Sequence, residues 1–410
     1  MSVSTTPAAG AVTVAEGGVS APLGFTTSAL HCGIKASALD LMVLAIEGTA
    51  TAAGIFTTNV VKAAPVLLCQ EHLRQTGGRA RAIVVNSGCA NACTGDEGMR
   101  NARQMAALTA AGVGCAPEEV LVASTGVIGV ALKMDALTSG IAAATASLAR
   151  GKGSEAARAI MTTDRFPKEG AVTVQTASGR FTIGGMAKGA GMIEPKMATM
   201  LGFLTTDAAV APELLRRALV DTARQTFNAI TIDGDTSTND SLFAFASGQS
   251  GVTITEAEYG LLVDGLVALS RELAMAIVSG GEGATKLIAV RTVGAPDDKT
   301  ADSVSRTIAN SLLVKTAVHG ADPNWGRILA AAGRSGVSFD PRTVTVHVGG
   351  ILLFEQGLPH DESAPLAAEY LKGATIDIEV DLGTRPGATA TVWTCDLSAE
   401  YVRINGEYRT

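Results

Sequence analysis

Short apolar segments alternate with longer amphipathic or Ala-rich segments along most of the chain. This pattern predicts strands at 81–86, 119–124, 201–205, 286–293, 343–348, 376–380 and 389–394, and helices at 97–111, 133–150, 259–279 and 302–314. Segments 172–175 and 180–183 alternate around Ser178-Gly179, which predicts a hairpin, and Pro212 stands at a helix N1 position. The mixed order predicts a layered α/β fold with a partly antiparallel sheet. Residues 1–21, rich in Ser, Thr, Ala and Gly, are expected to form a loose leader.

Composition narrows the class of protein. Hydrophobic residues make up 47% of the 410 residues and charged residues 17%, which excludes a disordered chain. The net charge of -7 gives no electrostatic basis for binding nucleic acid or an anionic membrane. No apolar run reaches the roughly 18 residues of a spanning helix, and the first 20 residues lack the basic and apolar parts of a secretory signal. We therefore expect a cytoplasmic α/β enzyme.

The cysteines and histidines predict little chemistry. The six cysteines are scattered, so we expect reduced thiols and no disulfide framework. Cys89 and Cys93 form a CxxxC without a nearby His or second Cys pair, so buried small residues are favoured over a zinc site and no metal is expected. The five histidines form no HExxH motif and suggest no Ser-His-Asp triad.

The segment 184–201, GGMAKGAGMIEPKMATML, is the densest anomaly. Its glycines allow tight packing or positive φ, and a strand is predicted to start at or near Thr199. One interpretation is an N-terminal nucleophile: Thr199 Oγ attacks the Ala198 carbonyl, the chain is cut, and the freed α-amine replaces histidine as the base. The other is a Gly-rich hairpin followed by an ordinary β-branched strand residue, and spacing alone favours it.

Three further segments have a functional and a plain structural interpretation. In 280–286, GGEGATK, Thr precedes Lys, so the phosphate-loop order fails, and Glu282 either faces a cation or is a solvated turn residue. The segment 233–240, DGDTSTND, lacks the Gly and Glu that a calcium loop needs, so turn and capping chemistry is favoured. Thr125-Gly126 either stabilises an oxyanion or forms a tight turn.

Together, nine segments in order resemble the ornithine acetyltransferase family of arginine biosynthesis. They are AAGIFTTNVVKAAPV (52–66), NSGCANACTG (86–95), STGVIG (124–129), IMTTD (160–164), KGAGMIEPKMATML (188–201), DGDTSTND (233–240), GGEGATK (280–286), HGADPNWGRI (319–328) and EYVRINGEYRT (400–410). The resemblance implies an α/β layered sandwich with a smaller C-terminal α/β lobe. It also implies self-cleavage at Ala198–Thr199 into an α-chain, 1–198, and an interwoven β-chain, 199–410, in an α2β2 assembly.

The same resemblance implies roles for individual residues. Thr199 is the nucleophile, and the Thr125 hydroxyl and Gly126 N–H form the oxyanion pair. The residues implied to bind ornithine are Thr163 (preferred over Thr162), Lys188, Thr199, Glu282, Asn405 and Thr410. The implied reaction is ping-pong acetyl transfer from N-acetylornithine to glutamate through acetyl-Thr199. It needs no cofactor, and the use of acetyl-CoA as a second donor stays open.

Two departures and two alternatives accompany this assignment. Cys89 stands where the family usually has Asn, and 24–35 contains His31-Cys32 where small residues are usual. An N-terminal-nucleophile aminopeptidase or amidase would share the cleavage chemistry but hydrolyse its acyl-enzyme. A non-enzymatic binding protein would not need Thr199, Thr125 and Gly126 together.

Overall fold

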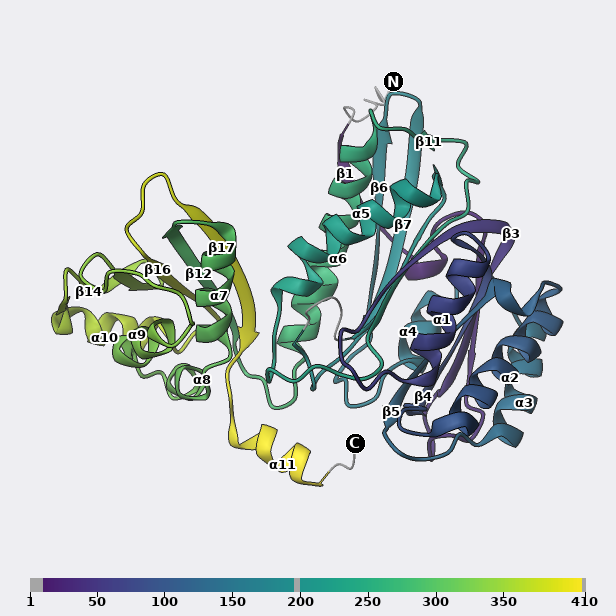
Figure 1. Cartoon of the computed structure of the whole chain (residues 1–410), viewed down its shortest axis with the longest axis horizontal. Coiled ribbons are helices and arrows are strands. Elements are labelled where there is room, and N and C mark those ends of the chain that lie inside the picture. The colour runs from purple at the N-terminus through teal and green to yellow at the C-terminus, as the bar shows by residue number, and fades with distance from the viewer. Residues whose placement is uncertain (1–9, 195–199, 408–410) are drawn as a thin grey trace, which may run out of the picture.

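The chain folds into a large lobe and a smaller C-terminal lobe (Figure 1), which we describe from a computed structural model covering residues 10–194 and 200–407. The C-terminal helix, α11 (Ala399–Glu407), leaves the small lobe and returns toward the large one. In the described ranges, no helix is long and apolar enough to cross a membrane.

A nine-stranded mixed sheet forms the centre of the large lobe. Its strands are β1 (Val12–Ala15), β2 (Phe25–Leu30), β3 (Leu41–Phe56), β4 (Arg79–Cys89), β5 (Val120–Val127), β6 (Lys168–Thr176), β7 (Gly179–Lys188), β8 (Leu201–Thr206) and β10 (Ser241–Ala246). They follow the order β1-β6-β7-β8-β10-β3-β4-β5, and β2 pairs with β3. A two-stranded sheet of β9 (Ala209–Val210) and β11 (Thr253–Ile254) lies beside it.

The long strand β3 lets this sheet fold back on itself. A register shift between Ala45 and Ala50 divides β3, and only the part after the shift pairs with β10. The two halves of the sheet then face each other across an apolar core, in which Met42 and Val85 from one half join Phe203 and Phe243 from the other. The phenylalanines stack with ring centroids 5.7 Å apart. The interior is therefore a β-sandwich.

Helices cover both outer faces of the sandwich and complete four layers. They are α1 (Ala64–Gln75), α2 (Gly95–Val113), α3 (Met134–Ala146), α5 (Pro212–Gln225) and α6 (Tyr259–Ser279). The short helix α4 (Gly153–Ala159) instead packs its alanines into the core between the two halves of the sheet. Apolar residues of α2 and α3 pack on the outer face of β3, β4 and β5, and those of α5 and α6 pack on the outer face of β7, β8 and β10. The layered α/β sandwich predicted from the sequence is confirmed.

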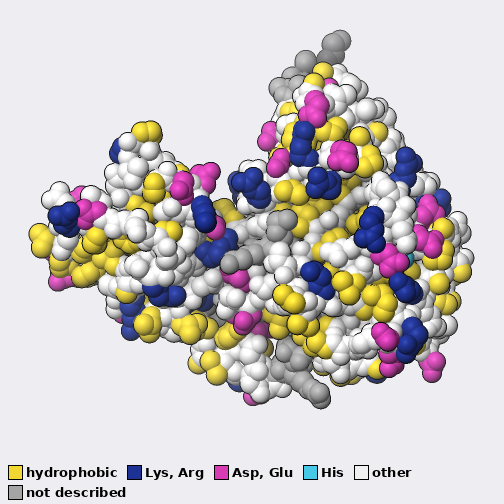
Figure 2. Space-filling view, viewed as in Figure 1, with side chains coloured by type: hydrophobic (Ala, Val, Ile, Leu, Met, Phe, Trp, Pro, Cys, Tyr) yellow, Lys and Arg dark blue, Asp and Glu magenta, His cyan; other side chains and the backbone are white. Residues whose placement is uncertain are grey.

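The C-terminal lobe has its own sheet and its own core. Its strands are β12 (Leu287–Ala295), β13 (Thr345–Val348), β14 (Ile351–Glu355), β15 (Leu358–Pro359), β16 (Thr375–Asp381) and β17 (Ala388–Cys395), in the order β15-β14-β13-β16-β12-β17. Its helices are α7 (Asp298–Ala309), α8 (Leu312–His319), α9 (Trp325–Gly333) and α10 (Ala364–Tyr370). A groove of about 1090 Å³ separates the lobes, with Lys and Arg side chains on both walls (Figure 2).

Most predicted elements are confirmed, with longer or shorter ends. The predicted helix at 259–279 is α6, Pro212 starts α5, and the predicted hairpin is the antiparallel pair β6 and β7. The strand after the Gly-rich segment begins at Leu201. The sequence pattern did not predict the strands β1, β2, β3, β9, β10, β11, β14 and β15 or the helices α1, α4, α9, α10 and α11.

Two predictions are wrong. Part of the expected loose leader is built into the fold, because β1 pairs antiparallel with β6 and a 3-10 turn buries Val19 and Ser20. The single helix predicted at 302–314 is instead α7 and α8. The Ser311 side chain accepts a hydrogen bond from the Val314 N–H and starts a second helix there.

Candidate active site

One pocket collects most of the residues that the sequence singled out. It has a volume of about 140 Å³, and its lining residues come from the ends of β5 and β7, the start of β8 and α11. The residues that line it include Thr125, Gly126, Thr162, Thr163, Lys188, Gly189, Gly191, Met192, Asp233, Asp235, Asp240, Glu282, Tyr401 and Asn405.

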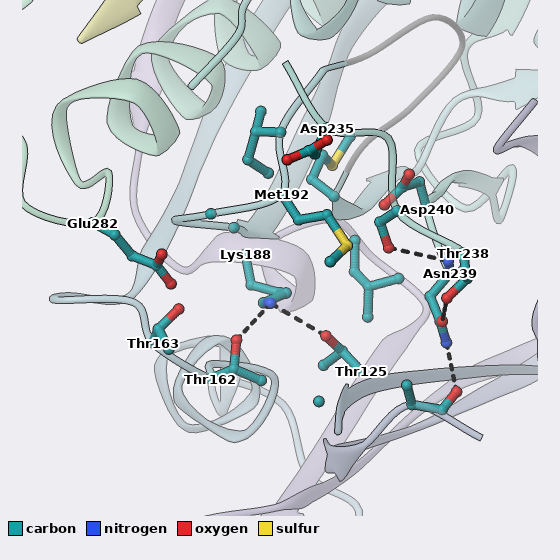
Figure 3. Close-up of a pocket in the computed structure, with 18 of the residues that line it drawn as sticks. Thr125, Thr162, Thr163, Lys188, Met192, Asp235, Thr238, Asn239, Asp240 and Glu282 are labelled. Atoms are coloured by element: carbon teal, nitrogen blue, oxygen red, sulfur yellow. Dashed lines mark hydrogen bonds between the residues drawn. The ribbon is translucent and has the colours of Figure 1, made fainter. Parts of the chain in front are cut away.

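Lys188, the last residue of β7, places a buried ammonium on the pocket wall. Its Nζ donates to Thr162 Oγ1 at 2.7 Å and to Thr125 Oγ1 at 3.2 Å (Figure 3). Burial lowers the pKa of Lys188, and the nearby Asp164 carboxylate offsets part of that shift. The lysine therefore connects the end of β7 to β5 through the Thr125 hydroxyl and to the segment between α4 and β6 through the Thr162 hydroxyl.

Asp164 stabilises this arrangement from behind the pocket. Its carboxylate accepts from Lys168 Nζ at 2.6 Å and from the Gly189 N–H at 2.7 Å. Burial alone would raise the pKa of Asp164, but the charges of Lys188 and Lys168 and the hydrogen bonds lower it to about 2. Asp164 is thus ionised and fixes the start of the Gly-rich loop.

The Thr125-Gly126 pair lies at the end of β5, beside the irregular end of β4. Gly126 has φ +128°, and a Cβ there would lie 2.4 Å from the Gly88 carbonyl carbon. Only glycine fits this position. The Thr125 hydroxyl accepts the Lys188 bond, which leaves its own proton free to donate elsewhere.

Glu282 and Asn405 form the opposite part of the pocket. The Asn405 Nδ2 donates to Glu282 Oε2 at 2.7 Å, and the Glu282 N–H donates to the Ala190 carbonyl at 2.8 Å. A Cβ on Gly191 would lie 2.4 Å from Glu282 Oε2, so glycine allows this close approach. Glu282 is 7% exposed, and the solvated-turn interpretation is therefore wrong.

The Asp233 carboxylate accepts hydrogen bonds from backbone N–H groups, as its sequence favours. Besides the local bond from the Asp235 N–H, it accepts from residues distant in sequence. Asp233 accepts from the Met192 N–H at 2.6 Å and from the Ile193 N–H at 2.9 Å. Tyr401 of α11 donates to the same carboxylate at 3.2 Å. Asp233 thus holds together three segments that are distant in sequence. Across residues 10–194 and 200–407, no group of three or more His, Cys, Asp or Glu side chains is placed to hold a metal ion.

The pocket brings together six of the predicted site residues: Thr125, Gly126, Thr163, Lys188, Glu282 and Asn405. The predicted nucleophile Thr199, its cleavage partner Ala198 and the predicted ligand Thr410 lie outside the described residues. Met200 and Leu201, which follow the predicted cleavage point, line the same pocket.

The structure adds to the threonine assignment and reveals residues that the sequence analysis missed. Thr162 bonds Lys188, whereas the preferred Thr163 lies beside it on the pocket lining, nearer to Glu282 (Figure 3). Asp164, Asp240 and Tyr401 were not singled out individually. Only their presence inside segments already noted, 160–164, 233–240 and 400–410, could have pointed to them.

Comparison with known proteins now gives this pocket a context. The family model described as "ArgJ family" matches residues 26–410. The chain is 48% identical to the "Arginine biosynthesis bifunctional protein ArgJ" of Synechocystis, with 97% of this chain and 99% of that protein covered. It is also 48% identical to the protein of the same name from Symbiobacterium thermophilum, with 96% and 99% covered.

Two solved structures are also similar. The Bacillus halodurans arginine biosynthesis bifunctional protein ArgJ has 42% identity and a TM-score of 0.49, covering 51% of this chain and 100% of that one. The Mycobacterium tuberculosis ornithine acetyltransferase, solved with ornithine, has 44% identity and a TM-score of 0.42, covering 46% and 100%. From the family match and the relatives that align along its length, this chain belongs to the ArgJ family.

Proposed function

We propose that this chain is an acetyltransferase of arginine biosynthesis that moves an acetyl group from N2-acetyl-L-ornithine to L-glutamate. The family match and the names of the relatives support the pathway. The observation that carries the proposal is the pocket, which is lined by an ammonium, Lys188, by a carboxylate, Glu282, and by the Thr125-Gly126 pair. A pocket with both charges suits a small molecule that carries both.

The charges assign the ends of the substrate. N2-acetylornithine carries an α-carboxylate and a side-chain ammonium, and its acetyl amide is neutral. We place the carboxylate near Lys188 and the ammonium near Glu282, where Asn405 orients the carboxylate that receives it. The hydroxyls of Thr162 and Thr163 lie between these two groups and complete the polar lining.

The first half-reaction forms an acetyl-enzyme on Thr199. The Thr199 Oγ attacks the acetyl carbonyl, the α-amine of the same residue takes the hydroxyl proton, and the amide C–N bond breaks. That proton passes to the departing nitrogen, and ornithine leaves. Met200 and Leu201, which directly follow Thr199 in the sequence, line the pocket. This supports the assignment of Thr199 as the nucleophile.

The oxyanion of this step is assigned to Thr125 and Gly126. Because Thr125 Oγ1 already accepts from Lys188, its remaining hydrogen is available to donate to a developing negative charge. The ammonium polarises that hydroxyl and makes it a stronger donor. Lys188 therefore has two roles in the proposal, one toward the substrate carboxylate and one toward Thr125.

The second half-reaction returns the enzyme to its starting state. Glutamate binds after ornithine leaves, and its amine attacks the Thr199 ester to give N-acetylglutamate and free Thr199. Whether acetyl-CoA also acetylates the enzyme is decided by an assay with acetyl-CoA and glutamate alone. N-acetylglutamate formed in that mixture would make the chain bifunctional.

The active form requires the chain to be cut before Thr199. We propose that Thr199 Oγ attacks the Ala198 carbonyl, that the acyl group shifts from nitrogen to oxygen, and that water hydrolyses the ester. This gives chains of 1–198 and 199–410, which we propose assemble as α2β2. Both segments supply strands to one sheet, with β1 to β7 on one side of the cut and β8 and β10 on the other.

A purified-enzyme exchange assay separates this function from the amidase alternative. We expect radiolabelled acetyl groups to move from N-acetylornithine to glutamate, with little free acetate while glutamate is present. Thr199→Ala should give one uncut chain and no transfer. Acetate release that is independent of glutamate would instead support a hydrolase.

A further inference from the structure

Met192 lines the pocket, and the proposed mechanism gives its side chain no role. Its backbone has φ +56°, a left-handed conformation that residues with a side chain rarely adopt. Glycine would take this conformation without strain, yet the position carries a long apolar side chain. Strained conformations of this kind persist only where the surrounding structure holds them, and they are concentrated at functional sites. The conformation of Met192 therefore points to a use for its side chain.

The Asp233 carboxylate holds the backbone of Met192 in this conformation. Its Oδ2 accepts from the Met192 N–H at 2.6 Å, and its Oδ1 accepts from the Ile193 N–H at 2.9 Å. The Tyr401 hydroxyl bonds to the same carboxylate and ties it to α11. Ile193 is 2% exposed and belongs to the core of the large lobe. Since the loop is fixed at two consecutive residues, its backbone sets the direction of the Met192 side chain.

The Met192 side chain extends into the pocket (Figure 3). In this view Glu282 lies on one side of Lys188, and the thioether of Met192 lies on the other side with Thr125. The proposed pose places the substrate ammonium at Glu282 and the α-carboxylate at Lys188. The acyl amide is attached to the same carbon as that carboxylate, so it lies at the end of the substrate away from Glu282. Met192 therefore faces the acyl group.

We propose that Met192 determines the size of the acyl group that the enzyme transfers, because its thioether closes the acyl end of the pocket. This inference rests on the proposed function, since it uses the substrate pose given there. An acetyl group has a single methyl beyond its carbonyl carbon, and longer acyl groups extend further in the same direction. The thioether occupies that space, and the backbone of Met192 is held by Asp233 and cannot withdraw. Met192 thus acts as a specificity-determining residue.

The test compares N2-acetyl-, N2-propionyl- and N2-butyryl-L-ornithine as donors, with glutamate as acceptor and ornithine release as the readout. The wild-type kcat/KM should fall about 10-fold for each added methylene. Met192→Ala removes the thioether, so it should raise the ratio of butyryl to acetyl kcat/KM by about 10-fold or more. Met192→Leu keeps most of the side-chain volume and should retain the wild-type order of the three donors.

Ile277→Val is the matched control. Ile277 belongs to α6 and packs beside the same loop from the core side, since a Cβ on Gly189 would lie 3.7 Å from its Cγ2. It is not among the described residues that line the pocket. This variant loosens the packing behind the loop without opening the acyl end. Its ratio of butyryl to acetyl kcat/KM should match that of the wild type.

An unchanged ratio in Met192→Ala, or an equal change in Ile277→Val, would overturn the role given to Met192. A wild type that transfers butyryl as well as acetyl would overturn it too. So would a Met192→Ala chain that never cleaves, because the side chain would then act before a substrate binds. A wild type that transfers no acyl group from any of the three donors would instead overturn the proposed function itself.

Discussion

At the scale of single residues, the pocket depends on backbone positions that exclude a side chain. Gly126 combines a positive φ with close contact to the backbone of Gly88. Gly191 allows the Gly-rich loop to lie against the Glu282 carboxylate. The chain contains 46 glycines among 410 residues. Some of them thus have a specific use, since tight backbone approach brings donors and acceptors to one small cavity.

Gly126→Ala should abolish acetyl transfer and lower the free energy of unfolding by at least 2 kcal/mol, on the order expected for strain and overpacking. The cause is the contact with the Gly88 carbonyl carbon, which is backbone and cannot turn away. Gly129→Ala is the matched control: Gly129 also has a positive φ, +77°, but nothing lies within 4 Å of its added Cβ. Urea unfolding and the exchange assay check both variants. Equal losses would contradict this account of Gly126.

Glu282→Gln should raise the KM for N-acetylornithine by about 10- to 100-fold, because a charge-assisted hydrogen bond to a cation contributes about 1.5–3 kcal/mol. The shape and the Asn405 contact are nearly preserved, so the fold should survive. Asn405→Ala should give a smaller rise, since it removes only the orienting donor. Steady-state kinetics at fixed glutamate checks both. An unchanged KM in the Glu282 variant would remove the carboxylate from substrate binding.

At the scale of elements, the sequence pattern predicted the helices and strands that form mainly through interactions between residues close in sequence. The α6 helix and the β6–β7 hairpin follow from periodicity and turn residues, and Pro212 begins α5 as its fixed φ requires. The break between α7 and α8 depends on one capping hydroxyl inside an apolar run, which periodicity hides. Strand β3 was missed because a register shift and several glycines and threonines interrupt its alternation.

The site was predictable from the sequence only in part. Thr125, Lys188, Glu282 and Asn405 came from resemblance to a family, because their spacing alone favoured turns and strand residues. Their meeting in one pocket depends on the order of the strands and on the return of α11, which no local pattern encodes. The Asp164–Lys168 ion pair was missed because its importance comes from burial, which also depends on how distant elements pack together.

Asp164 should make stability depend on acid pH. Its pKa is about 2 in the fold against 3.8 for the free group, so its stabilising effect is present above pH 4 and is lost as pH falls through 2. The shift corresponds to about 2 kcal/mol. Asp164→Asn should lower the free energy of unfolding at neutral pH and flatten its decline between pH 4 and 2.

The control for Asp164 is Asp340→Asn. Asp340 also has a pKa of about 2, but its partnership with Arg342 is on the surface and is screened by solvent. Its removal should leave the pH profile of unfolding nearly unchanged. A profile for Asp164→Asn that parallels the wild type would show that the carboxylate contributes no pH-linked stability.

Helix α7 should be coupled to the Gly-rich loop through a buried ion pair. Arg306 Nη1 lies 3.2 Å from Glu194 Oε1, and Asn310 donates to the other oxygen at 3.0 Å. Arg306→Gln would leave the Glu194 carboxylate buried without its cation and should cost about 3–5 kcal/mol of unfolding free energy. Asp302→Asn, which removes the exposed partner of Arg306, should cost less than about 1 kcal/mol. Chemical denaturation distinguishes the two, and equal costs would contradict the coupling.

At the scale of the whole molecule, the sheet order determines how a cut chain would behave. Strands β8 and β10 lie between β7 and β3, so the part after residue 199 is inserted into the middle of the part before it. Phe203 and Phe243 fill the sandwich core against residues of β3 and β4. Neither part can keep that core closed alone.

The two fragments should therefore stay together after cleavage. We expect native size-exclusion chromatography to give one species containing both chains, and a denaturing gel to give bands of 198 and 212 residues, since 410 − 198 = 212. Separation should require denaturant. Two fragments that elute apart in buffer would contradict the role given to β8 and β10.

The most direct measurement of the central claim is the intact mass of the denatured enzyme after incubation with N-acetylornithine in the absence of glutamate. The account predicts two fragments, with the 199–410 fragment heavier by one acetyl group on Thr199 and restored to its original mass when glutamate is added. A single uncut chain that still transfers acetyl groups, or a cut enzyme that transfers them without this adduct, would contradict the account.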